Sequence, residues 1–168
     1  MKYFDTNITN FKVRYATKDD INIIFDYIKK LAEYEHLLNE VKATQQELTE
    51  SIFERHRAET LIAEYNGSPV GFALYFYNYS TFLGKANMYL EDLFIDEEYR
   101  NRGFGKAIFA VLAKICIQQG CGRLDWSVLN WNTPSIEFYK RLGARPIDDW
   151  TVYRLDEEKL KNLSQHIK

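Results

Sequence analysis

The sequence predicts an α/β domain with a mixed central sheet flanked by helices. Short stretches with apolar residues at every second position alternate with longer stretches whose apolar residues recur every three to four positions. Capping boxes precede two of the helical stretches, and glycines follow two others. These observations give the element order β-α-α-β-β-β-α-β-α-β.

The first third of the chain contains one strand and two helices. Residues 11–16, FKVRYA, alternate as a strand does. Thr17 and Asp20 then form a capping box, and Thr44 with Glu47 forms a second one that opens a shorter helix. The helix after the first box has apolar residues at helical spacing, namely Ile21, Ile24, Phe25, Ile28 and Leu31.

The rest of the chain alternates strands with two further helices. Strands are expected at residues 60–65, 70–79, 85–96, 123–130 and 150–155, and the last of them closes the sheet. The first two flank Asn-Gly-Ser-Pro, which is typical of a tight turn between antiparallel strands. A helix over 105–119 ends at Gly120, and another has Thr133 as its cap, Pro134 at its first position and Gly143 at its end.

Length and composition bound the class of protein. The 168 residues most simply give a short polar arm over 1–10 and a single domain over 11–168. A formal net charge of −2 gives no reason to expect nucleic acid or a membrane as a partner. The N-terminus lacks an apolar signal core, and no run of about 18 apolar residues occurs, so a cytoplasmic location is expected.

The cysteines and histidines predict neither a disulfide framework nor a metal site. Cys116 and Cys121 do not form a Cys-x-x-Cys pair, so we expect free thiols in a reducing compartment. His36, His56 and His166 show no metal-ligand spacing with them. No metal is therefore predicted.

The glycine-rich stretch at residues 100–106, RNRGFGK, separates a strand from a helix. Backbone N–H groups and the helix dipole converge there on an anion site, which Gly103 and Gly105 leave open to phosphate oxygens. The spacing excludes a P-loop, GxxxxGK[ST], and a dinucleotide fingerprint, GxGxxG. A glycine turn that binds nothing, with solvated cations, is the alternative.

Arg-x-x-Gly-x-Gly at 100–105 resembles the acetyl-CoA pyrophosphate loop of the GNAT superfamily of N-acetyltransferases. The element order agrees with that acyl-CoA N-acyltransferase fold over roughly residues 11–155. Four stretches resemble the spermidine/spermine (diamine) and thialysine acetyltransferase subfamily, namely residues 28–35, 70–85, 89–105 and 129–144. The resemblance implies the GNAT fold, acetyl-CoA as cofactor with CoA as product, and a homodimer, for which the many aromatic residues leave room.

The resemblance also implies which residues hold acetyl-CoA. The exposed backbone of the strand before the loop would pair with the pantetheine arm, at Leu93, Phe94 and Ile95. The loop would hold the pyrophosphate, at Arg100, Asn101, Arg102, Gly103, Phe104, Gly105 and Lys106. The family completes its cofactor site at positions that match Asn132, Thr133, Pro134 and Ser135, with Tyr139 reaching the sulfur.

Acetyl transfer to an amine requires two proton movements. The attacking nitrogen must be neutral, whereas a lysine-like ammonium has a pKa of about 10.4, and the departing sulfur benefits from a proton. By resemblance, Glu91 is the base, acting through a water, and Tyr139 is the acid. The alternatives are an exposed strand-edge carboxylate at Glu91 and a core aromatic beside Phe138 at Tyr139.

The expected acceptor is a small cation, such as a polyamine, a diamine or a lysine-like molecule like thialysine. The positions that match the family's acceptor site are Tyr34, Glu35, Asp125, Trp126, Ser127 and Asp149, and we add the carboxylates of Glu91 and Asp92. Their carboxylates favour a cation by charge complementarity. Asp92 faces away from Glu91 by period-two alternation, and either binds the cation or serves as a structural acceptor. Asp148 competes with Asp149, because the loop there is shorter than in vertebrate polyamine enzymes.

Two other functions fit the same fold. One is an N-acetyltransferase for a peptide or an amino-sugar antibiotic. The other is a non-catalytic acyl-CoA-binding module, against which the presence of both Glu91 and Tyr139 argues.

Overall fold

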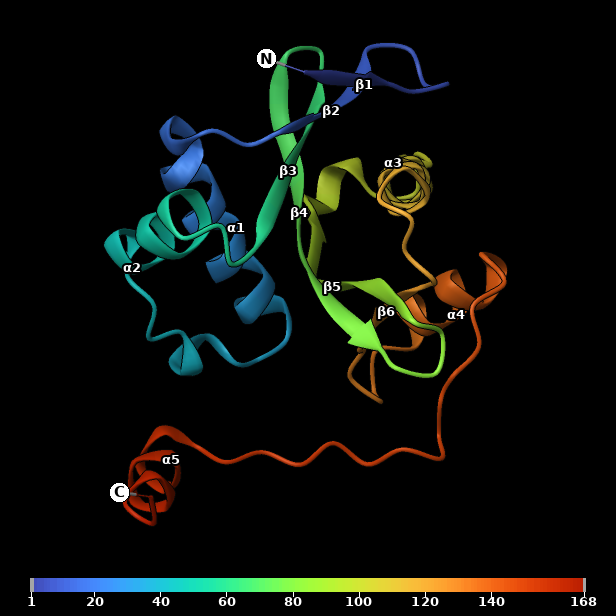
Figure 1. Ribbon diagram of the computed structural model, residues 1–168. Coiled ribbons are helices and arrows are strands. Elements are labelled where there is room, and N and C mark those ends of the chain that lie inside the picture. The colour runs from blue at the N-terminus through green and yellow to red at the C-terminus, as the bar shows by residue number, and fades with distance from the viewer. Residues whose placement is uncertain (1, 168) are drawn as a thin grey trace. The chain divides into compact units, whose positions relative to one another are not determined.

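The mixed sheet predicted from the alternating stretches is present in the computed structural model, which describes residues 2–167. Among these residues the sheet has six strands in the order β1-β2-β3-β4-β5-β6 (Figure 1). Pairs from β1 to β5 are antiparallel, whereas β6 runs parallel to β5. The strands are β1 (Tyr3–Asp5), β2 (Phe11–Tyr15), β3 (Glu59–Tyr65), β4 (Ser68–Ser80), β5 (Lys85–Ile95) and β6 (Leu124–Trp126).

The chain divides into two compact units, one that ends at Trp131 and one that begins at Asn132. In the first unit, α1 (Ile21–Tyr34) and α2 (Gln45–Thr49) cover one face of the sheet and α3 (Phe104–Gln118) covers the other (Figure 1). Single turns flank these helices, namely η1 (Lys18–Asp20), η2 (Leu38–Glu40), the π-helical η3 (Glu50–Glu54) and η4 (Glu97–Tyr99). Both predicted capping boxes are confirmed.

Apolar side chains fill both faces of the sheet in the first unit. On the α1 face, one buried cluster joins the helices to the central strands, and its members are Ile24, Tyr27, Ile52, Ile62, Phe72, Leu74 and Phe94. On the α3 face, Phe104 stacks on Phe11 with ring centroids 4.0 Å apart. Because β4 and β5 are packed from both sides, their register is fixed, and they form a rigid base for a functional site.

The second unit contains α4 (Thr133–Arg141) and α5 (Glu157–Ser164), of which α5 was not predicted. The N-cap of α4 is Asn132 rather than Thr133, because the Asn132 side chain accepts a hydrogen bond from the N–H of Ser135 at 3.3 Å. Pro134 therefore lies at the second helical position, where its missing N–H is equally harmless. Gly143 ends the helix with φ +86°, as predicted.

The predicted strand at 150–155 is wrong, because no strand is assigned there in the described part of the chain. The alternation of apolar and polar residues in this segment indicates a propensity for extended structure, but a strand also needs a neighbouring strand with which to pair. Trp150, Val152 and Tyr153 are 75%, 86% and 92% exposed. The strand expected over 123–130 is shortened to β6, and β1 arises within the predicted arm, where Phe4 is buried.

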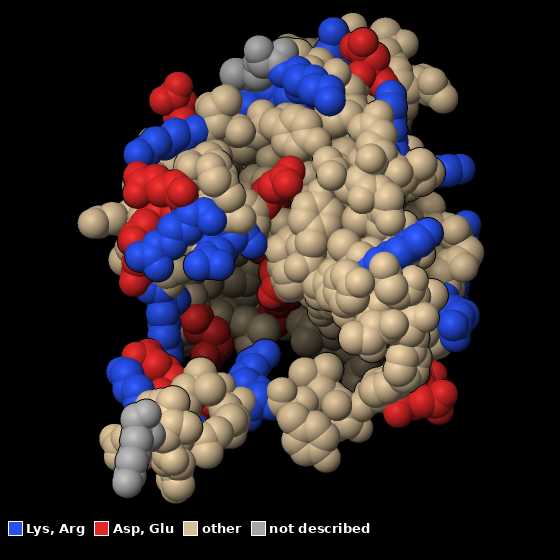
Figure 2. Space-filling view, in the orientation of Figure 1, with Lys and Arg blue, Asp and Glu red and all other residues tan. Residues whose placement is uncertain are grey.

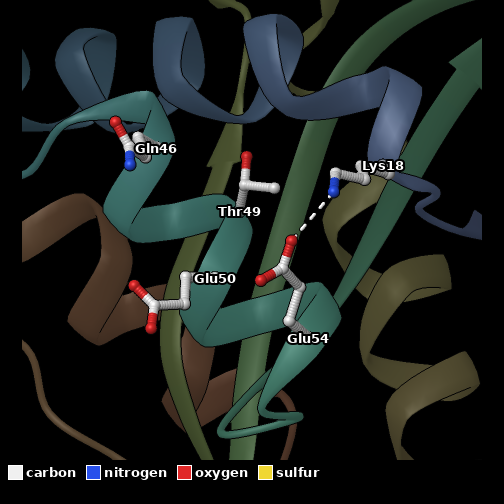
Figure 3. Close-up of a pocket in the computed structure, with 5 residues that line it drawn as sticks. All are labelled: Lys18, Gln46, Thr49, Glu50 and Glu54. Carbon is white, nitrogen blue, oxygen red and sulfur yellow. Dashed lines mark hydrogen bonds and ion pairs between the residues drawn. The ribbon is translucent and has the colours of Figure 1, made fainter.

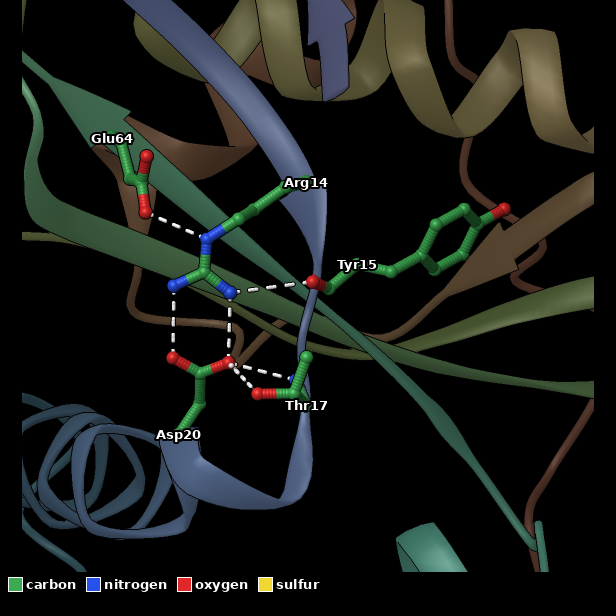
Figure 4. Close-up of polar contacts among 5 residues, drawn as sticks. All are labelled: Arg14, Tyr15, Thr17, Asp20 and Glu64. Carbon is green, nitrogen blue, oxygen red and sulfur yellow. Dashed lines mark hydrogen bonds and ion pairs between the residues drawn. The ribbon is translucent and has the colours of Figure 1, made fainter. Parts of the chain in front are cut away.

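A buried ion network fastens β2 to the start of α1 (Figure 4). The Arg14 guanidinium donates to both Asp20 oxygens, at 2.7 and 2.8 Å, and to Glu64 at 2.6 Å. Asp20 also accepts from the N–H of Thr17 at 2.7 Å. The hydrogen bonds from Arg14, more than any other contact, lower the pKa of Asp20. The stability that this carboxylate contributes is therefore present above its unfolded pKa, about 3.9, and is lost as the pH falls further.

We expect Asp20→Asn to lower the free energy of unfolding at pH 7 by about 3 kcal/mol, because it leaves the Arg14 charge buried with one carboxylate fewer. Urea denaturation measures this loss, which should shrink as the pH falls from about 4, the unfolded pKa, through the lowered pKa of the folded Asp20 carboxyl. Asp26→Asn removes an exposed pair with Lys29 and should cost less than about 0.5 kcal/mol. Equal losses in the two variants would contradict a stabilising role for the network.

Candidate active site

A β-bulge interrupts β5 at Glu91. Leu74 of β4 faces Asp92, and the next residue, Tyr75, faces Leu90, so in the described pairing Glu91 has no opposite residue. Leu90 and Leu93 consequently lie on the same sheet face although they are three residues apart. The period-two argument that turned Asp92 away from Glu91 therefore does not hold across this point. Bulges of this kind redirect a side chain, here an exposed carboxylate.

The backbone of β5 is open on one side just beyond the bulge. β6 pairs with β5 only from Met88 to Leu90, whereas β4 accompanies β5 as far as Ile95. No strand among the described residues occupies the edge of residues 91–95 on the β6 side. The three predicted pantetheine-binding residues lie on this edge. An extended ligand with amide groups can pair with such an edge as an added strand does.

Gly71 keeps β4 close to this open segment of β5. It faces Ile95, and a Cβ at this position would lie 2.5 Å from the carbonyl oxygen of Phe94. It would also lie 3.2 Å from the Cα of Ile95. Both neighbours are backbone atoms, which cannot move aside as a flexible side chain can. The position of the open edge therefore depends on a glycine in the neighbouring strand.

The predicted phosphate loop connects η4 to α3. Asn101 and Gly103 have positive φ angles of +62° and +85°, which reverse the chain sharply before the helix. Ala107 donates its N–H to the carbonyl of Gly103 at 3.0 Å, the i→i−4 bond that spans the first turn. The N–H groups ahead of that bond belong to Phe104, Gly105 and Lys106. With the helix dipole they form an arrangement suited to an anion.

The loop side chains have different surroundings. Phe104 is buried against Phe11, which leaves only its backbone for a ligand. Arg102 donates to the carbonyl of Glu98 at 3.1 Å and is exposed. Lys106 is exposed in the first turn of α3, where its ammonium adds positive charge to the helix N-terminus.

Residues of α1 contact both the loop and the segment that leads into it. Arg100 donates from Nε to the carbonyl of Ile95 at 3.0 Å, and its guanidinium lies 4.9 Å from the ring centroid of Tyr34. Asp96, between strand and loop, accepts a hydrogen bond from the hydroxyl of Tyr27 at 3.1 Å. Arg100 thus fastens the loop to β5 and α1, a positioning contact that the motif alone did not reveal.

Two carboxylates of the predicted acceptor site act electrostatically on a third, Asp92. Asp92 lies on the α1 face of the sheet, opposite Leu74. Desolvation, followed by the negative charges of Glu91 and Glu35, raises the pKa of Asp92 to about 7. Burial also raises the pKa of Glu35, which is the residue after the end of α1. A bound cation would relieve this mutual repulsion and favour the ionised forms.

The predicted acceptor residues of β6 and the turn after it divide between the two sheet faces. Ser127 Oγ lies 2.6 Å from the hydroxyl of Tyr89, which lies on the α1 face. Trp126 packs instead against Phe109 of α3, with ring centroids 5.0 Å apart. The carboxylate of Asp125 accepts a 2.7 Å hydrogen bond from Arg123.

The remaining predicted residues lie in the second unit. Asn132 to Ser135 form the capped start of α4, and Tyr139 follows in its second turn. The Tyr139 ring is tilted by 55° to that of Phe138, with centroids 5.5 Å apart. Asp148 and Asp149 are both exposed in the segment after α4.

A surface hollow of about 430 Å³ lies elsewhere, between η1 and the α2–η3 segment (Figure 3). It is lined by Lys18, Gln46, Thr49, Glu50 and Glu54, and none of these is a predicted site residue. The Lys18 ammonium donates to Glu54 at 2.9 Å, so two of the charged side chains that line the hollow form an ion pair with each other. We therefore place the candidate active site along β5 and not in this hollow.

Two further surface properties are the distribution of charge on one face and the hydropathy of the helices. Basic and acidic side chains are interspersed over the face shown in Figure 2. No helix in the described chain has the length and apolar character needed to cross a membrane.

Comparisons with known proteins bear on the family of this chain. A model of the acetyltransferase (GNAT) family matches residues 25–144. The thialysine N-epsilon-acetyltransferase of Bos taurus is 34% identical over 164 residues, covering 90% of this chain and 96% of that protein. Spermidine/spermine N(1)-acetyltransferase-like protein 1 of Homo sapiens is 30% identical over 170 residues, which is 95% of this chain and 24% of that protein.

Solved structures show the same fold. An integron cassette protein from the mobile metagenome of V. cholerae superimposes with a TM-score of 0.77 at 25% identity, covering 94% of this chain and 99% of its own. The strand order, the open edge of β5 and the glycine loop before α3 occur here in one chain whose sequence matches the family over most of its length. The chain therefore belongs to the acetyltransferase (GNAT) family and is an acyltransferase with the GNAT fold.

Proposed function

We propose that this enzyme transfers acetyl from acetyl-CoA directly to a primary amine of a small cationic acceptor, such as a polyamine, a diamine or a lysine-like molecule such as thialysine. The observation that carries the proposal is the group of carboxylates at Glu35, Glu91 and Asp92, in which burial and the charges of the other two raise the pKa of Asp92. They belong to β5 and to the end of α1, and β5 is also the strand with the open edge. The relatives named for thialysine and for spermidine/spermine support the same substrate class.

The residues along β5 and the loop fit acetyl-CoA. When bound, it supplies an activated acetyl thioester. The open edge at Leu93, Phe94 and Ile95 offers backbone groups for the amides of the pantetheine arm. The N–H groups at the start of α3, together with Lys106, suit the pyrophosphate. Asn132 to Ser135 complete the cofactor site in this proposal, on the basis of the family resemblance.

Proton movement is assigned to two side chains, Glu91 and Tyr139, and binding of the acceptor to a third, Asp92. Glu91, which the bulge displays at the surface of the strand, accepts the ammonium proton through a water. Asp92 holds the cationic acceptor by its charge. Tyr139 donates a proton from its hydroxyl to the departing sulfur. Direct transfer then requires no protein nucleophile, only positioning of the amine against the thioester.

A panel of amines tests the proposed function. Thiol release from acetyl-CoA should be fast with thialysine, lysine, putrescine, spermidine or spermine, and slow with peptides and aminoglycosides. The reverse ranking would favour a peptide or antibiotic acetyltransferase. Acetyl-CoA binding without thiol release for any amine would favour a binding module.

We further propose that the enzyme is a homodimer located in the cytoplasm. The family resemblance supports the dimer, and the exposed aromatic side chains of Trp150 and Tyr153 offer apolar surface for an interface. The two free cysteines fit a reducing compartment.

The raised pKa of Asp92 predicts a pH dependence. Below about pH 7 the carboxyl is protonated and neutral, and above it the carboxylate attracts the cation, so kcat/KM for a cationic amine should rise with an inflection near 7. Rates measured from pH 5.5 to 9 should show this inflection in the native enzyme. Deprotonation of the amine adds a constant slope over this whole range, because its own inflection lies near pH 10, so it is distinguishable from an inflection near 7.

Asp92→Asn should remove the inflection near pH 7 while leaving the slope due to the amine. Glu33→Gln, which changes an exposed carboxylate on the neighbouring helix, is the matched control and should keep the native profile. An inflection that persists in Asp92→Asn would assign it to another group.

A further inference from the structure

The two cysteines flank the C-terminus of α3 in a defined backbone motif. The helix ends at Gln118, and Gly120 follows with a φ of +68°. Cys121 donates its N–H to the carbonyl of Cys116 at 2.9 Å, and Gly120 donates to the carbonyl of Ile117 at 3.0 Å. These nested bonds around a left-handed glycine define a Schellman motif. The residues in the two positions whose side chains commonly touch in this motif are Cys116 and Cys121.

The backbone bond also limits the distance between the two cysteines. With standard bond lengths, a 2.9 Å bond from the N–H of Cys121 to the carbonyl of Cys116 allows their Cα atoms to be at most about 6.8 Å apart. Disulfides span Cα separations of about 4.4 to 6.8 Å. The motif therefore keeps the Cα separation of the pair from exceeding the upper limit that disulfides span.

The side chains interact as this geometry requires. Burial, followed by the charge and the hydrogen bond of the Cys121 thiol, raises the pKa of Cys116 to about 11. Cys116 Sγ also donates to the carbonyl of Arg123 at 3.5 Å. That carbonyl accepts a second hydrogen bond, from the N–H of Met88 at 3.0 Å. If Cys116 lost its thiol hydrogen, the carbonyl of Arg123 would therefore still accept the hydrogen bond from Met88, and the β5–β6 pairing would stay intact.

We propose that Cys116 and Cys121 are a redox-active pair that forms a reversible intrachain disulfide by exchange with a small-molecule disulfide. Cys121 is half-buried and Cys116 is buried, so Cys121 reacts first. Its thiolate attacks one sulfur of the small disulfide, and the other sulfur leaves as a thiolate. The Cys116 thiolate then attacks Cys121 Sγ and displaces the second small thiol. Both cysteines are oxidised, and the small disulfide is reduced to two thiols.

The disulfide would join the last turn of α3 to the segment that connects α3 with β6. Gly122, which follows Cys121, donates its N–H to the carbonyl of Ala86 at 2.8 Å and so already joins this turn to β5. A covalent bond across the motif restricts the unfolded chain and should raise the midpoint of thermal unfolding. Reduction should return the midpoint to its original value.

Oxidised glutathione at pH 8.5, where more thiolate is present, tests the proposal on the full-length protein. Cleavage after Lys114 and Arg123 releases both cysteines in one peptide, residues 115–123. We expect this peptide to become lighter by two hydrogens in the folded protein and to recover with dithiothreitol. A stable glutathione adduct on Cys121, a disulfide between two chains, or no reaction would each overturn the proposal.

Single replacements distinguish the attacking thiol, Cys121, from the resolving thiol, Cys116. Cys116→Ala removes the resolving thiol, so Cys121 should accumulate a stable glutathione adduct. Cys121→Ala leaves only the buried thiol and should stay unmodified while folded. Rapid modification of Cys116 in the folded Cys121→Ala variant would contradict the proposed order. The wild-type peptide mass remains decisive even if either variant folds poorly.

Discussion

Tyr139→Phe should lower kcat by about 100-fold or more and leave the affinity for acetyl-CoA nearly unchanged. The replacement removes one hydroxyl and keeps the ring, so its packing beside Phe138 is preserved. General acid catalysis typically contributes about 10²- to 10⁴-fold to a rate. Thiol release at saturating amine gives kcat, and direct titration with acetyl-CoA gives the affinity. The two measurements separate a chemical role from a structural one.

A matched tyrosine serves as the control for this variant. Tyr79 is 65% exposed near the tip of the β4–β5 hairpin, and Tyr79→Phe should leave both kcat and acetyl-CoA affinity at native values. If kcat is unchanged in Tyr139→Phe, the side chain is not the acid. Equal losses of affinity and turnover would instead assign Tyr139 a structural role, as an aromatic side chain that packs beside Phe138.

Elements whose cause is local were predictable from the sequence. The capping boxes at Thr17 and Thr44 start helices where expected, because side chain and backbone satisfy each other within four residues. Asn66 and Gly67 both adopt positive φ, at +52° and +80°, and form the turn that their dipeptide predicts. The glycine loop before α3 likewise follows from its own residues.

Features that depend on a partner were not predictable. Residues 150–155 alternate as a strand does, but pairing is decided by a neighbour that the pattern does not contain. The bulge at Glu91 has one signal in the sequence. Leu90 and Leu93 are three residues apart, whereas apolar residues on one face of a regular strand are two residues apart. The contact of Arg100 with Tyr34 joins segments far apart in the chain, and no local pattern encodes it.

Gly71→Ala should be damaging although it adds one methyl group. Its Cβ would sit 2.5 Å from the carbonyl oxygen of Phe94, so β4 and β5 must separate at this point. Overpacking of this kind costs about 1 to 3 kcal/mol, and we expect the upper end because both neighbours are backbone atoms. Urea denaturation measures the loss. The same displacement moves the open edge of β5, so the KM for acetyl-CoA should also rise, by about 10-fold.

Gly67→Ala distinguishes this effect from a general intolerance of glycine replacement. Gly67 has a φ of +80° and no atom within 4 Å of an added Cβ, so alanine meets backbone strain of about 1 kcal/mol but no clash. Because the β3–β4 turn is not part of the proposed cofactor edge, the KM for acetyl-CoA should stay native in this variant. A native KM in Gly71→Ala, with stability lost, would mean that the edge at Phe94 and Ile95 does not bind the cofactor. A raised KM in Gly71→Ala alone would tie that edge to acetyl-CoA, because the two variants share the loss of a glycine and differ in which backbone they displace.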